Sequence, residues 1–331
     1  MEEDILVSIC CITYNQEKYI RDALEGFISQ KTNFKYEILI HDDNSTDKTK
    51  DIIKEYELKY PNLIKPIYQN ENQYSKGKKI TAEYNFPRVK GKYIAMCEGD
   101  DYWIDKNKLQ VQVDFLEKND DFSLAVHPSI YFNQENNIKS EKNYLNRDTV
   151  LDIRSFLNEY YKIIPGVLFQ TSSFVFRSDD IRKLLNEKIE FYFKCKVGDI
   201  PLVLYLATQG KIYFINKNMS VYRQNSIGSW TIKQRDNKTY LKHLTNMKEM
   251  YQLFNEYTQE HYEDIVNKFI NSIDFDINLN YGNYKRIISK EYKSLFKMLD
   301  LKTRIYILMT AYFPKLMKMY KLIKEKKNAK K

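Results

Sequence analysis

Buried apolar runs alternate with helical repeats over the first 130 residues, and this alternation limits the folds open to the chain more than any other feature. Residues 5–11 (ILVSICC) and 36–41 (YEILIH) are nearly continuous apolar runs, as are strands buried on both faces of a parallel sheet. Between them, residues 16–30 carry apolar side chains at helical spacing. This order predicts an α/β fold with a Rossmann-like, doubly wound and mostly parallel sheet flanked by helices.

Further elements follow from the same patterns. Thr46 is a good N-cap for a helix that runs to about Tyr60, ahead of Pro61. The next two strands are predicted at 64–68 and 92–97, with a helical stretch between them, and the polar residues 133–148 predict a surface loop. The middle of the chain adds strands at 173–177, 211–215 and 219–223 and helices at 179–187 and 200–209.

From residue 236 onward the apolar pattern is helical throughout. Helices are predicted at 236–260, 262–281 and 284–299, followed by a tail. We therefore divide the chain into an α/β domain at 1–235 and an all-helical C-terminal region at 236–331, which ends in a basic amphipathic tail.

The net charge of +9 comes from that tail. Residues 301–331 hold ten basic side chains and one acidic one, whereas the other 300 residues hold 43 of each sign. A neutral body argues against nucleic acid as a partner. Downstream of Pro314, which interrupts the helix, apolar residues between Lys315 and Lys327 form one stripe. Residues 302–331 therefore suit an anionic membrane surface, and packing of the stripe on the body, with solvated lysines, is the alternative.

Cysteine usage and the N-terminus point to the cytoplasm. The four cysteines contain no C-x-x-C, so neither a disulfide framework nor a zinc cluster is indicated. The chain begins with the acidic run Met1–Asp4 and shows no signal peptide, and no segment reaches the ~20 apolar residues of a membrane span. We expect a cytoplasmic protein that its tail can bring to the inner face of the plasma membrane.

Carboxylates follow two of the predicted strands. Asp42 and Asp43 end one strand, and Glu98-Gly99-Asp100-Asp101 ends another. Ligands of such sheets bind beyond the carboxyl ends of the strands. The chain has no G-x-G-x-x-G and no P-loop, so its carboxylates would contact phosphate through a divalent cation or accept hydrogen bonds from a nucleoside. The alternative is a turn whose acids face water.

Three segments carry a family resemblance. VSICCITYNQEKYIRDALEGFISQ (7–30), YEILIHDDNSTDKT (36–49) and GKYIAMCEGDDYW (91–103) occur in this order. They resemble the opening strand, loop and helix, the DDGSTD element and the D-x-D region of bacterial family 2 glycosyltransferases, which have the GT-A fold. The resemblance covers about residues 6–230, two-thirds of the chain.

The resemblance implies a nucleotide site and a metal. Asp100 would hold Mn²⁺ or Mg²⁺ against the diphosphate, while Asp101 supports the loop or contacts the sugar. Glu98 replaces the first aspartate of D-x-D and would reach a ribose hydroxyl or a metal-bound water. In the nucleotide site, Tyr14 would pack on the base, beside Thr13 and Asn15. Asp42 and Asp43 would accept hydrogen bonds from the base and the ribose. Further candidates for this site are Gly99, Lys76, Lys79 and Asn85.

The second half of the resemblance implies the chemistry. Gly198-Asp199-Ile200-Pro201-Leu202 matches the family's GD-x-PL segment, whose acid is the general base. The alternative for Asp199 is a helix N-cap, and the two roles are compatible. Arg223 would neutralise phosphate charge, and Trp103 and Trp230 are candidate aromatic walls for a sugar, with ordinary packing as the alternative. Gln224-Asn225-Ser226 stands where many relatives have a histidine metal ligand.

These features predict an inverting, metal-dependent hexosyl- or N-acetylhexosaminyltransferase. Its donor would be a nucleoside diphosphate sugar, with UDP-sugar favoured, and its acceptor a hydroxyl of a glycan, lipid-linked or protein substrate in bacterial surface polysaccharide or glycoconjugate assembly. A non-catalytic assembly protein that binds partners through its helices is an alternative from another class. A sugar nucleotidyltransferase would need a glycine-rich loop after the first strand, and a glycosidase would need its paired carboxylates to flank a sugar.

Overall fold

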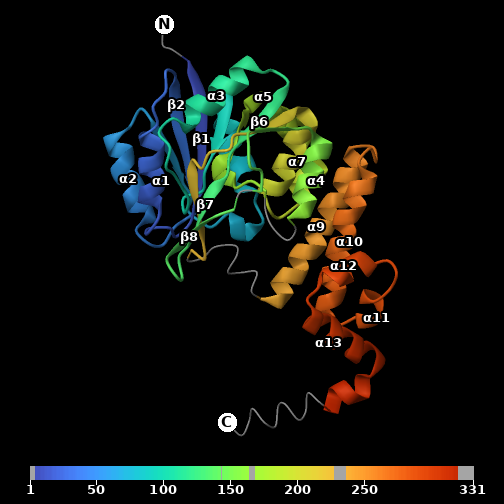
Figure 1. The fold of residues 1–331 in the computed structure, drawn as a ribbon. Coiled ribbons are helices and arrows are strands. Elements are labelled where there is room, and N and C mark those ends of the chain that lie inside the picture. The colour runs from blue at the N-terminus through green and yellow to red at the C-terminus, as the bar shows by residue number, and fades with distance from the viewer. Residues whose placement is uncertain (1–3, 143, 164–167, 227–235, 320–331) are drawn as a thin grey trace. The chain divides into compact units, whose positions relative to one another are not determined.

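The computed structural model describes residues 4–142, 144–163, 168–226 and 236–319. The chain divides into two compact units, Met1–Arg235 and Asp236–Lys331. The first unit is the predicted α/β fold, with helices on both sides of a mostly parallel central sheet (Figure 1). Trp230 lies outside the described residues, so its predicted contact with a sugar has no structural account.

The central sheet of the described residues has the strand order β3-β2-β1-β4-β10-β6-β11-β9. Neighbours β3, β2, β1 and β4 run parallel, β10 is antiparallel to both of its neighbours, and β11 is parallel to β6. The strands are β1 Ile5–Thr13, β2 Lys35–Asp42, β3 Ile64–Tyr68, β4 Tyr93–Met96, β6 Phe122–Val126, β9 Thr149–Leu151, β10 Val175–Arg177 and β11 Lys211–Phe214.

A smaller sheet of order β5-β12-β7-β8 extends the first unit. Strand β12 is antiparallel to β5 and parallel to β7, and it brings residues beyond 220 beside the segment that follows Asp101. Its strands are β5 Tyr102–Trp103, β7 Ser129–Asn133, β8 Ile138–Glu141 and β12 Ser220–Gln224. Strand β8 corrects the prediction that residues 133–148 form a loop throughout, since its exposed polar residues hide the strand pattern.

Helices of the first unit pack on the central sheet through their apolar stripes. Helix α1, for example, buries Ile20, Leu24 and Phe27. The helices are α1 Ile20–Ile28, α2 Thr49–Lys59, α3 Lys108–Lys118, α4 Ile153–Lys162, α5 Ser178–Glu187, α6 Glu190–Lys194 and α7 Asp199–Gln209.

Two predicted helix features of the first unit need correction. Helix α2 begins at Thr49 and not after Thr46, because the Thr46 N–H donates to Asn15 Oδ1 (2.7 Å) and Asp47 Oδ1 accepts from the Thr49 N–H (2.9 Å). The helical stretch predicted between β3 and β4 is a series of short 3₁₀ and π turns, at Tyr74–Lys76, Thr81–Asn85 and Phe86–Arg88.

The second unit is helical, as its periodicity predicts. Helices α9 (Asn237–Tyr257) and α10 (Glu263–Asn280) pack together, with the rings of Tyr251 and Phe269 stacked at 4.7 Å. The helix predicted at 284–299 is two short helices, α11 (Tyr284–Ile287) and α12 (Lys293–Met298), since the chain turns between them and buries Tyr292. Helix α13 (Leu301–Tyr312) buries Ile307.

The tail is described only as far as residue 319. Helix α13 ends before Phe313 and a helical turn restarts at residue 314, so Pro314 interrupts the helix as predicted. Of the predicted amphipathic stripe, Leu316 and Met319 are described, whereas Tyr320 and Ile323 fall on residues 320–331, outside the described part. Among the described helices, none combines the length and the apolarity needed to cross a bilayer.

Candidate active site

The strand ends that carry the predicted site residues meet at one edge of the central sheet. Thr13 pairs with Asp42 across β1 and β2, and Cys10 pairs with Met96 across β1 and β4. The Gly99 N–H donates to the Ile12 carbonyl (3.0 Å), which brings the loop after β4 onto the end of β1. The carboxyl ends of three parallel strands therefore present their polar loops side by side, where such sheets bind ligands.

The loops after β1 and β2 are tied together by hydrogen bonds. Asn15 has a left-handed backbone (φ 52°), and its N–H donates to Ser45 Oγ (2.9 Å). The Gln16 N–H donates to Thr49 Oγ1 (2.8 Å), and Thr13 Oγ1 donates to Gln16 Oε1 (2.7 Å). With its neighbours held in this way, the Tyr14 side chain stays 44% exposed, so its ring is open to a ligand.

Asp42 and Asp43 accept hydrogen bonds from different loops. Asp42 is fully buried and accepts the Ser45 N–H (3.2 Å), and burial raises the pKa of its carboxyl group. The two oxygens of Asp43 accept the N–H groups of Gln73 (2.8 Å) and Tyr74 (3.0 Å). Asp43 thus fixes the loop after β3 at the carboxyl edge of the sheet, a role that the sequence did not indicate.

The loop after β4 gathers negative charge. The pKa of Glu98 rises to about 8, because the side chain is buried and the carboxylates of Asp100 and Asp199 lie near it. Burial also raises the pKa of Asp100, against the opposing effect of the hydrogen bond that Ser226 Oγ donates to Asp100 Oδ2 (2.7 Å). These acids come from loops about 100 residues apart in the sequence, and they share one electrostatic environment.

Gly99 is required by close packing. A Cβ atom at this position would lie 2.5 Å from Gln16 Oε1 and 2.9 Å from Thr13 Cβ. Only a glycine lets the loop between Glu98 and Asp100 approach the end of β1 this closely. Gly99 therefore sets the distance between the end of β1 and the acidic loop.

Asp101 and Arg223 are reassigned by the structure. Asp101 is 1% exposed and accepts the Arg223 N–H (2.9 Å), so it supports β12 and does not reach an acceptor or a sugar. Arg223 is 6% exposed, donates to the Asp100 carbonyl (2.7 Å) and pairs with Asp22, with its guanidinium 4.4 Å from the centre of the Tyr102 ring. With its donors committed to these partners, Arg223 shapes the acidic loop and does not take the predicted phosphate contact.

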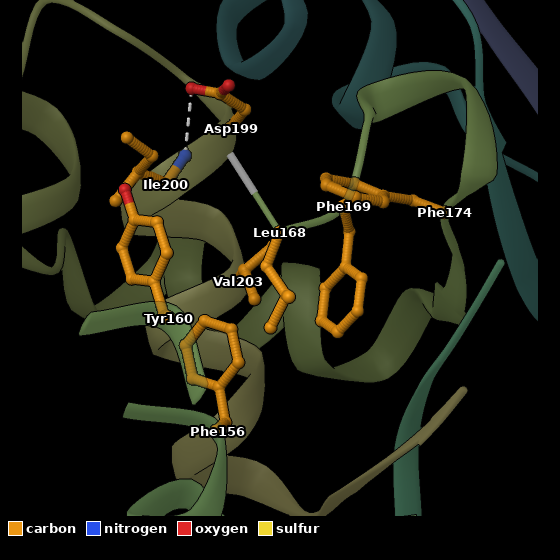
Figure 2. A pocket seen from close by; sticks show the side chains of 8 residues that line it. All are labelled: Phe156, Tyr160, Leu168, Phe169, Phe174, Asp199, Ile200 and Val203. Carbon is orange, nitrogen blue, oxygen red and sulfur yellow. Dashed lines mark hydrogen bonds between the residues drawn. The ribbon is translucent and has the colours of Figure 1, made fainter. Parts of the chain in front are cut away.

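Asp199 is the first residue of α7, and its Oδ1 accepts the Ile200 N–H (2.8 Å). Figure 2 shows its carboxylate at the edge of a small, partly open pocket. The pocket is walled mainly by apolar side chains of α4, α7 and the segment before β10, among them Phe156, Tyr160, Leu168, Phe174 and Val203. The same carboxylate acts electrostatically on Glu98 and Tyr222, which places it at the acidic edge. Asp199 thus occupies the first turn of α7, whose N-cap is Gly198, and lies close to the acidic loop.

The three nucleotide-site candidates between β2 and β4, Lys76, Lys79 and Asn85, lie in different environments. Lys76 is exposed and pairs with Glu71. Lys79 lies near Asp199, where its Nζ donates to the Val197 carbonyl (2.9 Å). Asn85 is fully buried and donates to the Cys11 carbonyl (3.0 Å), while its Oδ1 accepts from Arg88. We reassign Asn85 from the nucleotide site to support of β1, because burial keeps it from any ligand.

Trp103 is a core residue. Its side chain is 4% exposed, its Nε1–H donates to the Ser172 carbonyl (2.8 Å), and its ring meets Phe27 edge to face at 4.8 Å. The indole is therefore unavailable as the predicted wall for a sugar. The sequence pattern alone could not distinguish a core residue from a sugar-binding one, because an aromatic residue after an acidic loop suits both roles.

The acidic edge suits a divalent cation. Asp100 and Asp199 both act on Glu98 through their negative charges, and a cation near Glu98 would relieve that repulsion. No group of three or more His, Cys, Asp or Glu side chains forms a complete metal cage in the part of the chain that is described. The residues fit an ion that is held by one or two carboxylates and completed by substrate phosphate and water, as is usual for Mg²⁺.

Sequence reasoning missed two contributors to this edge. Ser226 Oγ donates to Asp100 Oδ2. Ser226 lies in the segment where many relatives have a histidine metal ligand, and this position in the sequence could have identified it. Tyr222 is half-buried near the acids, and desolvation together with Asp101, Glu98 and Asp100 raises the pKa of its phenol. The alternating pattern of β12 does not indicate that Tyr222 lies near these acids.

The chain matches the glycosyl transferase family 2 over residues 8–185, more than half of its length. It belongs to this family, and the GT-A fold and the resemblance drawn from the three motifs are confirmed. Of the solved structures, residues 1–349 of Staphylococcus aureus TarS give a TM-score of 0.59 at 16% identity, with 93% of this chain and 81% of that chain covered. At that identity the likeness concerns the fold.

Relatives by sequence include an uncharacterized protein, Rv1520, of Mycobacterium tuberculosis, 34% identical over 242 residues. The match covers 71% of this chain and 63% of that protein, so the chain spans less than two-thirds of this relative. Another is the UDP-Glc:alpha-D-GlcNAc-diphosphoundecaprenol beta-1,3-glucosyltransferase WfaP of Escherichia coli, 39% identical over 114 residues, which are 34% of this chain and 41% of that protein. Homologues thus include an enzyme of lipid-linked sugar biosynthesis.

Proposed function

We propose that this chain is an inverting, metal-dependent glycosyltransferase with a UDP-sugar as its donor. One observation carries the proposal: Asp199, at the start of α7, shares its electrostatic environment with Glu98 of the loop after β4. An acid suited to proton transfer and acids suited to a cation therefore lie together at the carboxyl edge of the sheet. The donor named for the Escherichia coli relative supports the choice of uridine.

The nucleotide would bind across the ends of β1 and β2. The exposed Tyr14 ring offers a face on which a base can stack. Asp42 and Asp43 are buried, so they would act on the nucleotide through the loops that they hold: Asp42 accepts the Ser45 N–H, and Asp43 accepts the N–H groups of Gln73 and Tyr74. A divalent cation held by Asp100 would neutralise charge on the diphosphate as it departs.

Asp199 would act as the general base. Its carboxylate takes the proton of an acceptor hydroxyl, whose oxygen forms a bond to the anomeric carbon of the donor while the bond from that carbon to the diphosphate oxygen breaks. Attack opposite the leaving group inverts the anomeric carbon. The acceptor hydroxyl would approach Asp199 beside the small pocket, whose apolar walls would limit the access of water to the proton transfer.

We further propose that the product belongs to a bacterial surface polysaccharide or glycoconjugate. The support is the Escherichia coli relative, whose printed acceptor is a sugar on a diphosphoundecaprenol carrier. A membrane-borne acceptor would also give a purpose to the basic residues at 302–331, which would bring a cytoplasmic enzyme to the inner face of the plasma membrane.

Donor binding and transfer can be tested separately. Thermal-shift assays with UDP-, GDP-, dTDP- and CDP-sugars plus Mn²⁺ should show stabilisation by UDP-sugars. In calorimetric titration Asp100→Ala should weaken metal-dependent binding, whereas Asp199→Asn should bind normally and lose at least about a hundredfold in transfer. Equal loss of binding in both variants would contradict these roles. Stabilisation by none of the donors would favour the non-catalytic assembly protein.

A further inference from the structure

Lys79 is a half-buried lysine whose ammonium group faces the segment that carries Asp199. Its Nζ donates to the Val197 carbonyl (2.9 Å) and lies 4.3 Å from the centre of the Tyr192 ring. Asp199 and Cys195 act on it electrostatically. All of these contacts lie between residues 192 and 199, so Lys79 is bound to one short stretch of chain that ends at the proposed base.

These contacts offset the free-energy cost of burying the Lys79 ammonium group. Burial lowers the pKa of Lys79 to about 8, against the opposing effects of Cys195 and Asp199. A desolvated ammonium group persists only when hydrogen bonds and opposite charge replace its hydration. The carbonyl, the ring face and the carboxylate supply that replacement, and they do so only while the segment at 192–199 keeps its place.

The other end of the Lys79 segment leads back to the nucleotide edge. Asp43 accepts the N–H groups of Gln73 and Tyr74 (2.8 and 3.0 Å). The Tyr84 hydroxyl donates to Gln73 Oε1 (3.2 Å). The loop that Asp43 fixes and the turn at residues 81–85 therefore hold the backbone from which Lys79 reaches across to Val197.

We infer that Lys79 is a positioning residue for the base: it ties the nucleotide-side loop to the Asp199 segment and places a positive charge near the Asp199 carboxylate. The inference rests on the proposed role of Asp199, and it moves Lys79 from the nucleotide to the base. Glu98 and Tyr222 also lie near Asp199, and a negative charge on Glu98 would repel that of Asp199. Lys79 supplies an opposite charge there.

The tether can be measured without knowing the substrate. Hydrogen–deuterium exchange of peptides covering residues 190–200 should rise in Lys79→Met, because the Val197 carbonyl and the Tyr192 ring lose their partner. Lys78→Met is the matched control. Lys78 is the exposed neighbour that pairs with Glu83 (3.0 Å), so its loss should leave exchange in residues 190–200 at the wild-type level.

The charge is tested by kinetics. Lys79→Met should lower kcat roughly ten- to a hundredfold, the range of a charge-assisted hydrogen bond, with little change in the KM for the donor. The acid limb of the kcat/KM profile should move to higher pH by about one unit, because removal of a neighbouring cation raises the pKa of a carboxylate. Lys79→Arg keeps the charge and should keep the wild-type acid limb.

The outcomes separate the inference from the proposed function. Wild-type exchange in residues 190–200 of Lys79→Met would overturn the tether, whatever the protein transfers. An unmoved acid limb in an active Lys79→Met enzyme would reduce Lys79 to a structural support and overturn its role toward the base. If the wild-type protein transfers no sugar from any donor while exchange rises in Lys79→Met, the proposed function fails and the tether stands.

Discussion

Protonation of His41 should destabilise the first unit below neutral pH. His41 is fully buried at the end of β2, stacked on Tyr84 at 4.8 Å, with its Nε2 3.0 Å from Gln69 Nε2. Desolvation lowers its pKa from 6.5 to about 4, against the opposing effect of Asp43. Because the fold favours the neutral ring, the stabilisation is present in full above pH 6.5 and is lost as the pH falls toward 4.

The magnitude follows from the two pKa values. With 6.5 in the unfolded chain and about 4 in the folded one, linkage removes about 2 kcal/mol from the free energy of unfolding between pH 7 and pH 5. His41→Gln removes the titrating ring. The variant loses the stacking on Tyr84 at every pH, so it starts less stable, and the contribution of residue 41 to its pH dependence is gone.

Urea unfolding followed by tryptophan fluorescence is a suitable assay, because both tryptophans of the chain, Trp103 and Trp230, lie in the first unit. The free energies of wild type and His41→Gln should converge by about 2 kcal/mol as the pH falls from 7 to 5. Parallel curves over that range would refute the reasoning, since they would mean that the ring titrates alike in the folded and unfolded chains.

Three further perturbations test the site and the tail. Gly99→Ala should weaken nucleotide binding, measured by calorimetry, because the new methyl group cannot lie 2.9 Å from Thr13 Cβ and the acidic loop must shift; unchanged binding would show that the loop accommodates it. Trp103→Phe should cost about 1–3 kcal/mol in urea unfolding, since the Ser172 carbonyl loses its donor, while the KM for the donor stays at the wild-type value. Deleting residues 320–331, which hold six lysines and one glutamate, should reduce sedimentation with anionic liposomes and spare transfer to a soluble acceptor; liposome binding at the wild-type level would remove the membrane role of the tail.

The tail deletion shows how the structure sharpens a prediction from sequence. The basic region predicted at 302–331 includes α13, whose Ile307 is fully buried in the second unit. Removal of the whole region would therefore unfold part of that unit and confound the liposome assay. A cut after residue 319 removes charge while leaving the packed helix in place.

The sequence was most informative where a local pattern decides the structure. Buried apolar runs predicted β1, β2 and β4, and parallel strands must bring their carboxyl ends to one edge, so Asp42 and Glu98 could be placed together before any coordinates. Partners distant in sequence could not be predicted. Trp103 finds Ser172 and Phe27 in the core, and Arg223 finds Asp22, and no spacing rule connects such pairs.

Hydrogen-bonding capacity explains which predicted residues remain available to a substrate. Arg223 and Asn85 have the residue types of a nucleotide site, and their polar groups serve Asp100, Asp22 and Cys11. Each of these two residues can therefore affect a substrate only by positioning the groups that it contacts. If its buried donor turned to a substrate, the existing hydrogen bond would be lost and the acceptor would remain unpaired. A substrate should therefore contact groups that the fold leaves accessible or under electrostatic stress. Tyr14, exposed after β1, and Glu98, whose pKa is raised by burial and by its acidic neighbours, are such groups.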